Sequence, residues 1–243
     1  MLRKDDLGGG LWLYQDPEAF CFGIDAVLLA HFPEIREGER VMDLGCGYAP
    51  IPMILAGTYR DIPFTVTGLE IQPGIAETAQ RSVEENGLSG QIRIIEGDIR
   101  EAVPSFGAAS FSLVTCNPPY MAAGTGIVGS NLRRAIARTE LTVTLRDVIF
   151  QAAGLLGPEG RFAMIHRPFR LPEILSLMQE ARLTPKRLRF VHPTADAEPT
   201  MILIEGVRGA KPYLRVAPPL IVYNDDRSYT QEISDIYSGL RRS

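Results

Sequence analysis

The stretch RVMDLGCGYAP, residues 40–50, decides the fold that we expect for this chain. Its first five residues form an apolar run typical of a buried strand, and Gly45 and Gly47 then permit a tight turn. The segment that follows, IPMILAGTY (51–59), has the composition of a helix. Strand, glycine turn and helix in succession indicate the first unit of a parallel α/β sheet.

The same alternation continues along most of the chain. After the strand at 40–44, six further strands are expected at 64–71, 91–98, 111–116, 161–166, 187–193 and 199–207. Helices are expected between them at 51–59, 73–87, 145–157 and 171–183. A short polar loop joins the last two strands, which predicts an antiparallel hairpin near one edge.

These elements predict an α/β protein with a doubly wound, mostly parallel seven-stranded sheet and a C-terminal antiparallel hairpin. Its 243 residues, 45% hydrophobic and 22% charged, have the composition of a globular protein. We expect one domain, with an N-terminal segment (1–39), a core (40–210) and a C-terminal tail (211–243). A ligand should bind beyond the carboxyl ends of the first strands.

Cysteine usage and hydropathy exclude several classes of protein. Cys21, Cys46 and Cys116 are scattered and odd in number, which predicts reduced thiols, no disulfide and no metal site. No apolar run approaches the roughly 20 residues that span a bilayer. The N-terminus lacks the apolar centre of a secretory signal. We therefore expect a cytoplasmic protein without membrane partners.

Charge is distributed unevenly along the chain. Residues 1–110 carry 8 Lys/Arg against 17 Asp/Glu, whereas residues 111–215 carry 14 against 8. A basic second half is typical of a surface that faces a polyanion, but solvated helix faces explain it equally well.

Acidic residues end two of the expected strands beside the glycine turn. Glu70 closes the strand at 64–71, where a carboxylate can accept hydrogen bonds from both hydroxyls of a ribose. A third glycine, which a dinucleotide site would require, is absent from the turn. The pattern therefore favours a nucleoside cofactor without a diphosphate. Asp98, at the end of the strand at 91–98, either contacts the adenine or caps the following helix.

The stretch VTCNPPY, residues 114–120, ends another strand on the same rim. The side-chain carbonyl of Asn117 and the backbone carbonyl of Pro118 can accept both hydrogens of a planar NH₂ group. The ring of Tyr120 can stack on a flat substrate. Together they suit methylation of an exocyclic or side-chain amide nitrogen, because the two acceptors stabilise the positive charge that develops on nitrogen. The structural alternative is a proline-rich turn with a capping asparagine.

The glycine turn, the strand-end acid and NPPY together resemble the class I S-adenosylmethionine-dependent amino-methyltransferases, which have a Rossmann-like fold. Further segments narrow the resemblance to the bacterial tRNA(Val) adenine-N6 methyltransferases, which modify adenosine 37. These segments are YQDPEAFCFGIDAVLLAHF (14–32), HRPFRLPEILSLM (166–178), LTPKRLRFVHP (183–193) and APPLIVYN (217–224), so that the resemblance covers nearly the whole chain.

The resemblance implies S-adenosyl-L-methionine as cofactor and assigns residues to it. Asp43, Gly45, Cys46 and Gly47 would line its methionine and ribose side, Glu70 and Ile71 would hold the ribose, and Asp98 and Ile99 the adenine. Asp25, before the segment AVLLA, would lie near the methionine end. Ala49 stands where many relatives carry glycine, and alanine should be tolerated there if its φ stays negative.

The resemblance also implies a tRNA substrate. Asn117, Pro118 and Tyr120 would bind and orient the target base, with Pro119 beside them. Arg133, Arg134 and Arg138 have the spacing of one helical face and would contact RNA, unless that face is only solvated. His166 and Arg167 end a strand on the same rim and could also meet RNA, although His166 is equally well explained as a packed histidine.

NPPY alone leaves other substrates open. A guanine amino group of ribosomal RNA and a glutamine side chain of a release factor present the same kind of nitrogen. A non-catalytic RNA-binding module is an alternative of another class, but such a module has no need of both Glu70 and Asn117.

Overall fold

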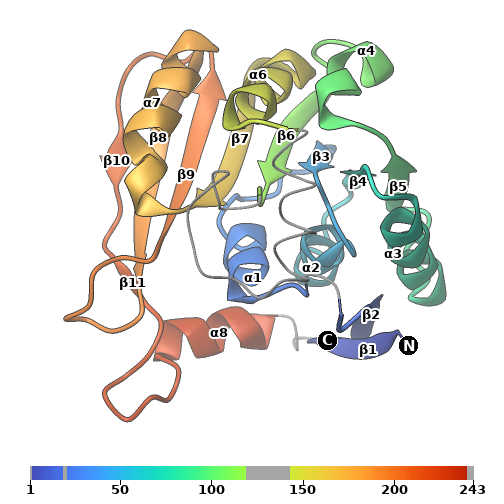
Figure 1. Ribbon diagram of the computed structural model, residues 1–243, viewed down its shortest axis with the longest axis horizontal. Coiled ribbons are helices and arrows are strands. Elements are labelled where there is room, and N and C mark those ends of the chain that lie inside the picture. The colour runs from blue at the N-terminus through green and yellow to red at the C-terminus, as the bar shows by residue number, and fades with distance from the viewer. Residues whose placement is uncertain (1, 19–20, 119–142, 240–243) are drawn as a thin grey trace.

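The computed structural model describes residues 2–18, 21–118 and 143–239 of this chain (Figure 1). Its centre is a nine-stranded sheet with the order β10-β8-β9-β7-β6-β3-β4-β5, in which β11 also pairs with β8. The seven long strands are β3 (Arg40–Leu44), β4 (Thr65–Glu70), β5 (Ile92–Glu96), β6 (Phe111–Cys116), β7 (Leu156–His166), β8 (Leu183–His192) and β9 (Met201–Arg208).

The sheet is mostly parallel, as the sequence predicts. Among the strands that the structure describes in this sheet, only β9 runs against its neighbours, because it pairs antiparallel with both β7 and β8. The expected hairpin is therefore confirmed, and its second strand lies inside the sheet rather than at its edge. Two strands of two residues, β10 (Arg215–Val216) and β11 (Leu220–Ile221), pair with β8 and raise the expected count from seven to nine.

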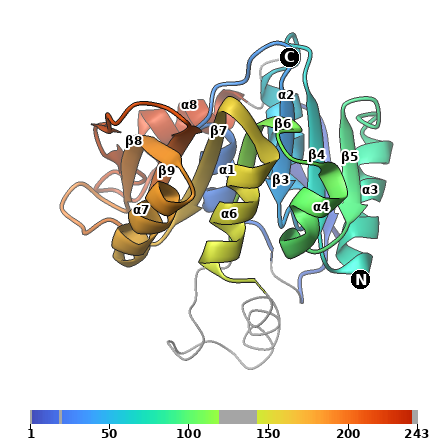
Figure 2. The ribbon, with the colours of Figure 1, turned by 90° about the horizontal axis from the view of Figure 1, so that it is seen from above.

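Helices cover both faces of the sheet (Figure 2). On one face lie α1 (Ile24–Ala30), α2 (Pro50–Thr58) and α3 (Pro73–Glu85). On the other lie α4 (Ala102–Phe106), α6 (Leu145–Leu155) and α7 (Leu171–Glu180). Among the described residues, no helix combines the length and apolarity that crossing a bilayer requires.

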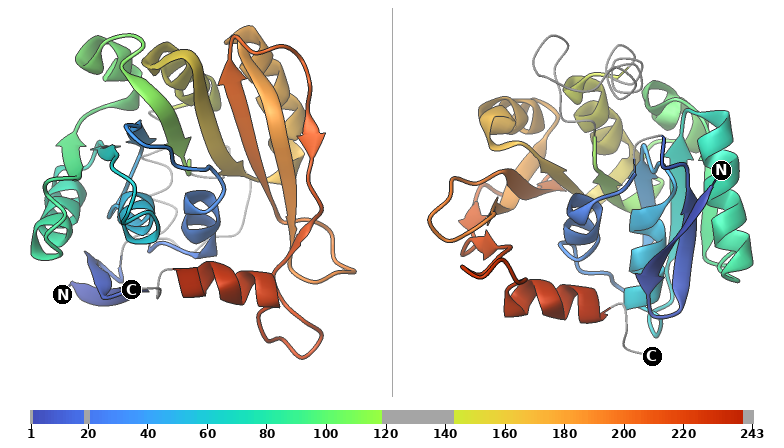
Figure 3. Two further views of the ribbon diagram at one scale, coloured as in Figure 1. Left: turned by 180° about the vertical axis from the view of Figure 1, so that it is seen from behind. Right: turned by 60° about the horizontal axis from the view of Figure 1, so that its bottom comes forward.

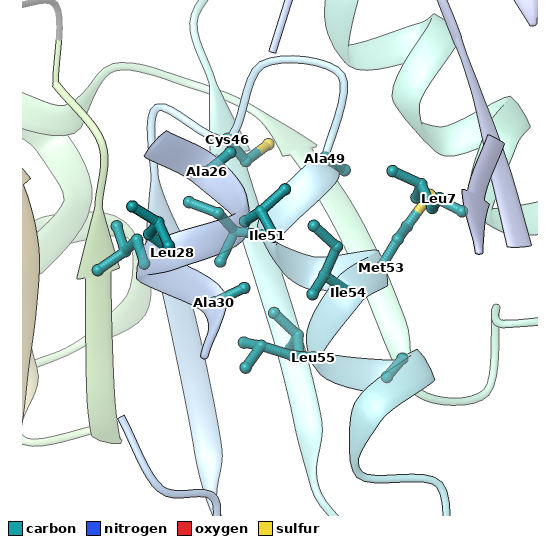
Figure 4. Close-up of a cluster of buried hydrophobic side chains, with 14 of the residues drawn as sticks. Leu7, Ala26, Leu28, Ala30, Cys46, Ala49, Ile51, Met53, Ile54 and Leu55 are labelled. Carbon is teal, nitrogen blue, oxygen red and sulfur yellow. The ribbon is translucent and has the colours of Figure 1, made fainter. Parts of the chain in front are cut away.

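The central strands supply side chains to two separate cores. Val41 and Leu113 face the core under α1 and α2, whereas Met42 and Val114 face the core under α6 and α7. This alternation follows from the two-residue period of a strand. It explains why the central strands read as continuous apolar runs, since both of their faces are covered. Figure 4 shows the first core, where Leu28 of α1 lies beside Ile51 of α2.

The N-terminal segment and the C-terminal tail both pack against the first helical layer (Figure 3). The hairpin of β1 (Arg3–Gly8) and β2 (Leu11–Gln15) lies against α3, and α8 (Gln231–Gly239) contacts α1. Asn86, just after α3, accepts a hydrogen bond from the backbone N–H of Trp12 at 3.1 Å and donates to its carbonyl at 2.7 Å.

Candidate functional site

The carboxyl ends of the parallel strands form one rim of the sheet, and the predicted site residues gather there. In register, Leu44 of β3 pairs with Leu69 of β4 and with Cys116 of β6, so the residues that follow these strands emerge side by side. The rim therefore brings together the glycine turn after β3, Glu70 at the end of β4 and Asn117 after β6.

The turn after β3 has the conformation that its glycines allow. Gly45 and Gly47 have φ values of 70° and 55°, in the left-handed region. Ala49, the residue before α2, also has a positive φ of 63°, so the condition named for tolerating alanine there, a negative φ, is not met. Ala49 thus holds a left-handed conformation although it carries a side chain and precedes Pro50, a position that favours extended backbone.

Glu70 connects the glycine turn after β3 to the start of α3. Its Oε2 accepts a hydrogen bond from the backbone N–H of Gly47 at 3.0 Å, and its Oε1 accepts one from the backbone N–H of Gln72 at 2.9 Å. The side chain is buried. Oε1 also accepts a longer hydrogen bond, 3.4 Å, from the side-chain Nε2 of Gln72, which a ligand's hydroxyl can replace. Oε2 has a second lone pair, so Glu70 can accept hydrogen bonds from a ligand while it holds the loop.

Asp43 is a buried acid at the base of the rim, with 1% of its surface exposed. Its Oδ1 accepts a hydrogen bond from the hydroxyl of Thr115 at 2.7 Å, whereas its Oδ2 has no hydrogen-bond partner among the described residues. The pKa of Asp43 is raised to about 7, mainly because the side chain is buried; the Thr115 hydrogen bond opposes this shift, and the charge of Glu70 adds a smaller upward contribution. A buried acceptor without a partner suits a ligand that brings a donor or a positive charge.

Cys46 and Ile99 occupy different positions relative to this turn. The side chain of Cys46 is buried in the first core, and its burial raises the pKa of the thiol (Figure 4). Only its backbone can therefore face a ligand on the rim. A side chain at Gly45 would lie 3.6 Å from Cδ1 of Ile99, so this isoleucine covers the glycine turn from the β5 side.

Asp98 caps the short helix η1 (Ile99–Glu101). Its Oδ1 accepts a hydrogen bond from the backbone N–H of Arg100 at 2.8 Å, and its carboxylate pairs with the Arg100 guanidinium. The hydrogen bond from that guanidinium lowers the pKa of Asp98. The capping role that the sequence left open is thus present in the structure.

Asn117 and Pro118 follow β6 directly, and Pro118 is buried. Nδ2 of Asn117 donates a hydrogen bond to Oδ2 of Asp25 in α1 at 3.1 Å. The other residues predicted around the target base lie outside the described residues. They are Pro119, Tyr120, Arg133, Arg134 and Arg138.

The end of β7 contributes His166 and Arg167. His166 is buried, and its Nδ1 accepts a hydrogen bond from the backbone N–H of Arg167 at 2.8 Å. Burial lowers the pKa of His166 to about 4, with a further contribution from the charge of Arg170, so the ring is neutral near pH 7. Arg167 donates a hydrogen bond to the carbonyl of Thr200 at 3.0 Å.

Sequence reasoning missed Phe169, which follows these residues in the short helix η2 (Pro168–Arg170). This aromatic side chain is 70% exposed on the ligand rim, between two arginines. An aromatic residue flanked by arginines just beyond a strand end is a signal that sequence reasoning could have used.

Comparison with known proteins gives a consistent result. The model of the methyltransferase small domain family matches residues 11–181. A tRNA1(Val) (adenine(37)-N6)-methyltransferase of Porphyromonas gingivalis is 31% identical over 193 residues, which cover 77% of this chain and 74% of the relative. A protein of the same name from Parabacteroides distasonis is 27% identical over 194 residues, 79% of each chain.

Solved structures share the fold at low sequence identity. A predicted O-methyltransferase from Agrobacterium tumefaciens superimposes with a TM-score of 0.72 at 22% identity, over 90% of this chain and 98% of the other. Geranyl diphosphate C-methyltransferase from Streptomyces coelicolor, in complex with S-adenosyl-L-homocysteine, has a TM-score of 0.56 at 16% identity, over 76% and 78% of the chains.

Proposed function

The chain belongs to the methyltransferase small domain family, and from that membership we propose that it methylates the N6 amino group of adenine in tRNA, with adenosine 37 of tRNA(Val) as the target. The methyl donor is S-adenosyl-L-methionine. The observation that carries the proposal is the placement of Asn117 and Pro118 after β6, on the same rim as Glu70 and the glycine turn.

The residues of the rim fit the methyl donor. Glu70 would accept hydrogen bonds from the ribose hydroxyls, and the unpartnered Oδ2 of Asp43 would receive the positively charged amino group of the methionine part. Gly45 and Gly47 let the backbone approach the ligand closely, and Asp98 and Ile99 would border the adenine. Bound there, S-adenosylmethionine supplies an electrophilic methyl group.

Asn117 and Pro118 supply what the acceptor nitrogen needs. The lone pair of an adenine amino group is delocalised into the ring, so the nitrogen is a poor nucleophile. Two carbonyl oxygens that accept its hydrogens orient the lone pair and stabilise the charge that develops during transfer. The neutral, hydrogen-bonded His166 is not required as a base in this scheme.

The whole chain forms the catalytic unit in this proposal, as one domain. The core (40–210) carries the rim, the N-terminal segment (1–39) adds Asp25 through α1, and the tail (211–243) closes on α1 through α8. A tRNA substrate places the enzyme in the cytoplasm. Arg167 and the exposed ring of Phe169 would meet the RNA beside the target base.

Methyl incorporation from labelled S-adenosylmethionine tests the proposal. Total tRNA, ribosomal RNA and release-factor protein are offered in parallel, and labelled nucleosides are identified by mass spectrometry. N6-methyladenosine in one tRNA is the expected product. Label in ribosomal RNA or protein would overturn the substrate, and the absence of label from all three would overturn the activity.

The variant Asn117→Ala separates catalysis from cofactor binding. We expect its kcat to fall roughly 100- to 1,000-fold, which is the usual effect of removing one group that stabilises transition-state charge. The Kd for S-adenosylmethionine, measured by calorimetry, should stay within about two-fold, because a target-facing carbonyl contributes little to a bound cofactor. A matching loss in both quantities would contradict the assigned role.

A further inference from the structure

A buried carboxylate holds Asn117 from the N-terminal segment. Asp25 is 8% exposed, and its Oδ2 accepts the hydrogen bond from Nδ2 of Asn117 at 3.1 Å. Its Oδ1 accepts a hydrogen bond from the backbone N–H of Ala26 at 3.0 Å. A side chain at Gly23 would lie 3.0 Å from Oδ1, so the backbone fits closely around the carboxylate. The position of Asp25 is therefore narrowly defined.

This contact fixes which end of the Asn117 amide faces which way. An ionised carboxylate offers only acceptors, whereas an amide has an NH₂ donor at one end and a carbonyl acceptor at the other. The NH₂ end must therefore face Asp25, and Oδ1 lies on the opposite side of the planar group. We propose that Asp25 is a positioning residue, which orients Asn117 so that its carbonyl oxygen meets the amino group of the substrate.

The orientation matters because the two ends of an amide are nearly equal in size. After a half-turn about χ2, the NH₂ group of Asn117 would point at the amino group of the target, donor against donor. This inference rests on the proposed function, since it assumes an amino group as the methyl acceptor. A hydrogen bond to a charged partner biases the orientation enough to account for a roughly 10- to 100-fold effect on rate.

Kinetics of Asp25→Ala give the first test. We expect kcat to fall roughly 10- to 100-fold, while the Kd for S-adenosylmethionine and the KM for tRNA change less than about three-fold. Asp25→Asn should lose less, because its amide can still present a carbonyl to Nδ2 of Asn117. A rise in the cofactor Kd that accounts for the whole loss would overturn the proposal, since Asp25 would then act on the cofactor.

A double-mutant cycle tests whether Asp25 acts through Asn117. In the Asn117→Ala background, Asp25→Ala should have no further effect on kcat. Additive losses would overturn the proposal. Glu39→Gln is the control for general destabilisation, because Glu39 is also a buried acid but pairs with Arg161 near the start of β3. Its kcat should equal that of the wild type at temperatures well below unfolding.

An experiment without catalysis separates this proposal from the proposed function. In the ¹⁵N-labelled wild type, the side-chain NH₂ of Asn117, assigned by its loss in Asn117→Asp, should exchange slowly with solvent. The same signal should exchange at least about ten-fold faster in Asp25→Ala, because its hydrogen bond to the Asp25 carboxylate is lost. Equal exchange in both proteins would overturn the positioning role, whichever substrate the wild type methylates.

Discussion

The protonation of one buried acid on the rim, Asp43, makes the stability of the folded protein depend on pH. Its pKa is raised to about 7 in the folded protein, against 3.8 for the ordinary carboxyl group. A raised pKa means that the folded state binds a proton more tightly than the unfolded chain. Its contribution to stability is therefore full below about pH 4 and is lost as the pH rises to about 7.

The isosteric variant Asp43→Asn isolates this effect. Between pH 4 and pH 7 the free energy of unfolding of the wild type, without ligand, should fall relative to the variant by on the order of 4 kcal/mol at most. Above about pH 7 the difference should stay constant. Urea unfolding of both proteins at several pH values measures it. Parallel curves over this pH range would show that Asp43 is ionised in the folded protein well below pH 7.

Phe169 is the residue with which we expect RNA to stack. Stacking of a base on an aromatic ring contributes about 1–3 kcal/mol, so Phe169→Ala should raise the KM for tRNA roughly 5- to 150-fold. Tyr213→Ala is the matched control, because Tyr213 is 73% exposed but precedes β10, away from the rim. An equal effect of the two variants would place the RNA elsewhere. Neither should change the Tm by more than a few degrees.

The sequence predicts single residues well where their role depends on the local chain. Glu70 and Asn117 follow apolar strands directly, and parallel strands must end at a common edge, so their meeting on one rim is predictable. The contact between Asp25 and Asn117 joins residues 92 positions apart, and only the packing of α1 produces it. The positive φ of Ala49 likewise depends on how α2 begins, which its residue type does not indicate.

At the scale of elements, Asn86 is one of the side chains that dock the N-terminal hairpin on α3, together with Ser82 and Glu85. Asn86 bonds both the N–H and the carbonyl of Trp12 in β2. Asn86→Ala leaves both groups without that partner, and we expect it to lower the free energy of unfolding by about 2 kcal/mol. Hydrogen exchange should accelerate in β1 and β2 and stay unchanged in β6. Uniform acceleration throughout the chain would mean that the hairpin does not open separately.

The strands and helices of the alternating core were predicted, and the elements before and after it were not. The seven main strands and α2, α3, α6 and α7 have enough residues for their hydrophobic period to be visible. The β1–β2 hairpin, α4, α8, β10 and β11 escaped prediction. The helix α4 and the strands β10 and β11 are too short to show a period, whereas β1, β2 and α8 lie outside the alternating strand–helix units of the core. The methyltransferase fold could thus be predicted from sequence, whereas the way its ends fold back could not.

At the scale of the whole molecule, four charged side chains, three of them buried, join distant strands near the amino ends of the sheet. Arg161 of β7 is 5% exposed and pairs with Glu39, before β3, at 2.5 Å. Its guanidinium also lies 3.8 Å from Glu205 of β9, which faces Arg187 of β8 at 3.9 Å. These four charges link the N-terminal half of the sheet to its C-terminal hairpin.

Removing the central cation should therefore destabilise the entire fold. Arg161→Ala leaves two carboxylates buried without their shared partner, and we expect a loss of about 3–5 kcal/mol in the free energy of unfolding. Arg146→Ala is the control, because its pair with Glu180 is exposed and should contribute less than about 1 kcal/mol. Urea unfolding measures both variants. If both lose a similar free energy of unfolding, the ion pairs of Arg161 stabilise the fold no more than an exposed pair does.

The position of β9 has a consequence for the order in which the molecule can assemble. The ribosome releases β7 first, then β8, and only afterwards β9, yet β9 lies between the other two. Until residue 208 has been synthesised, the edge of β7 that β9 will occupy has no strand to pair with, and β8 has no place in the sheet. The place of β9 between β7 and β8 must therefore stay empty until β9 has been synthesised. The strands that carry the site can pair before the C-terminal part of the sheet is complete.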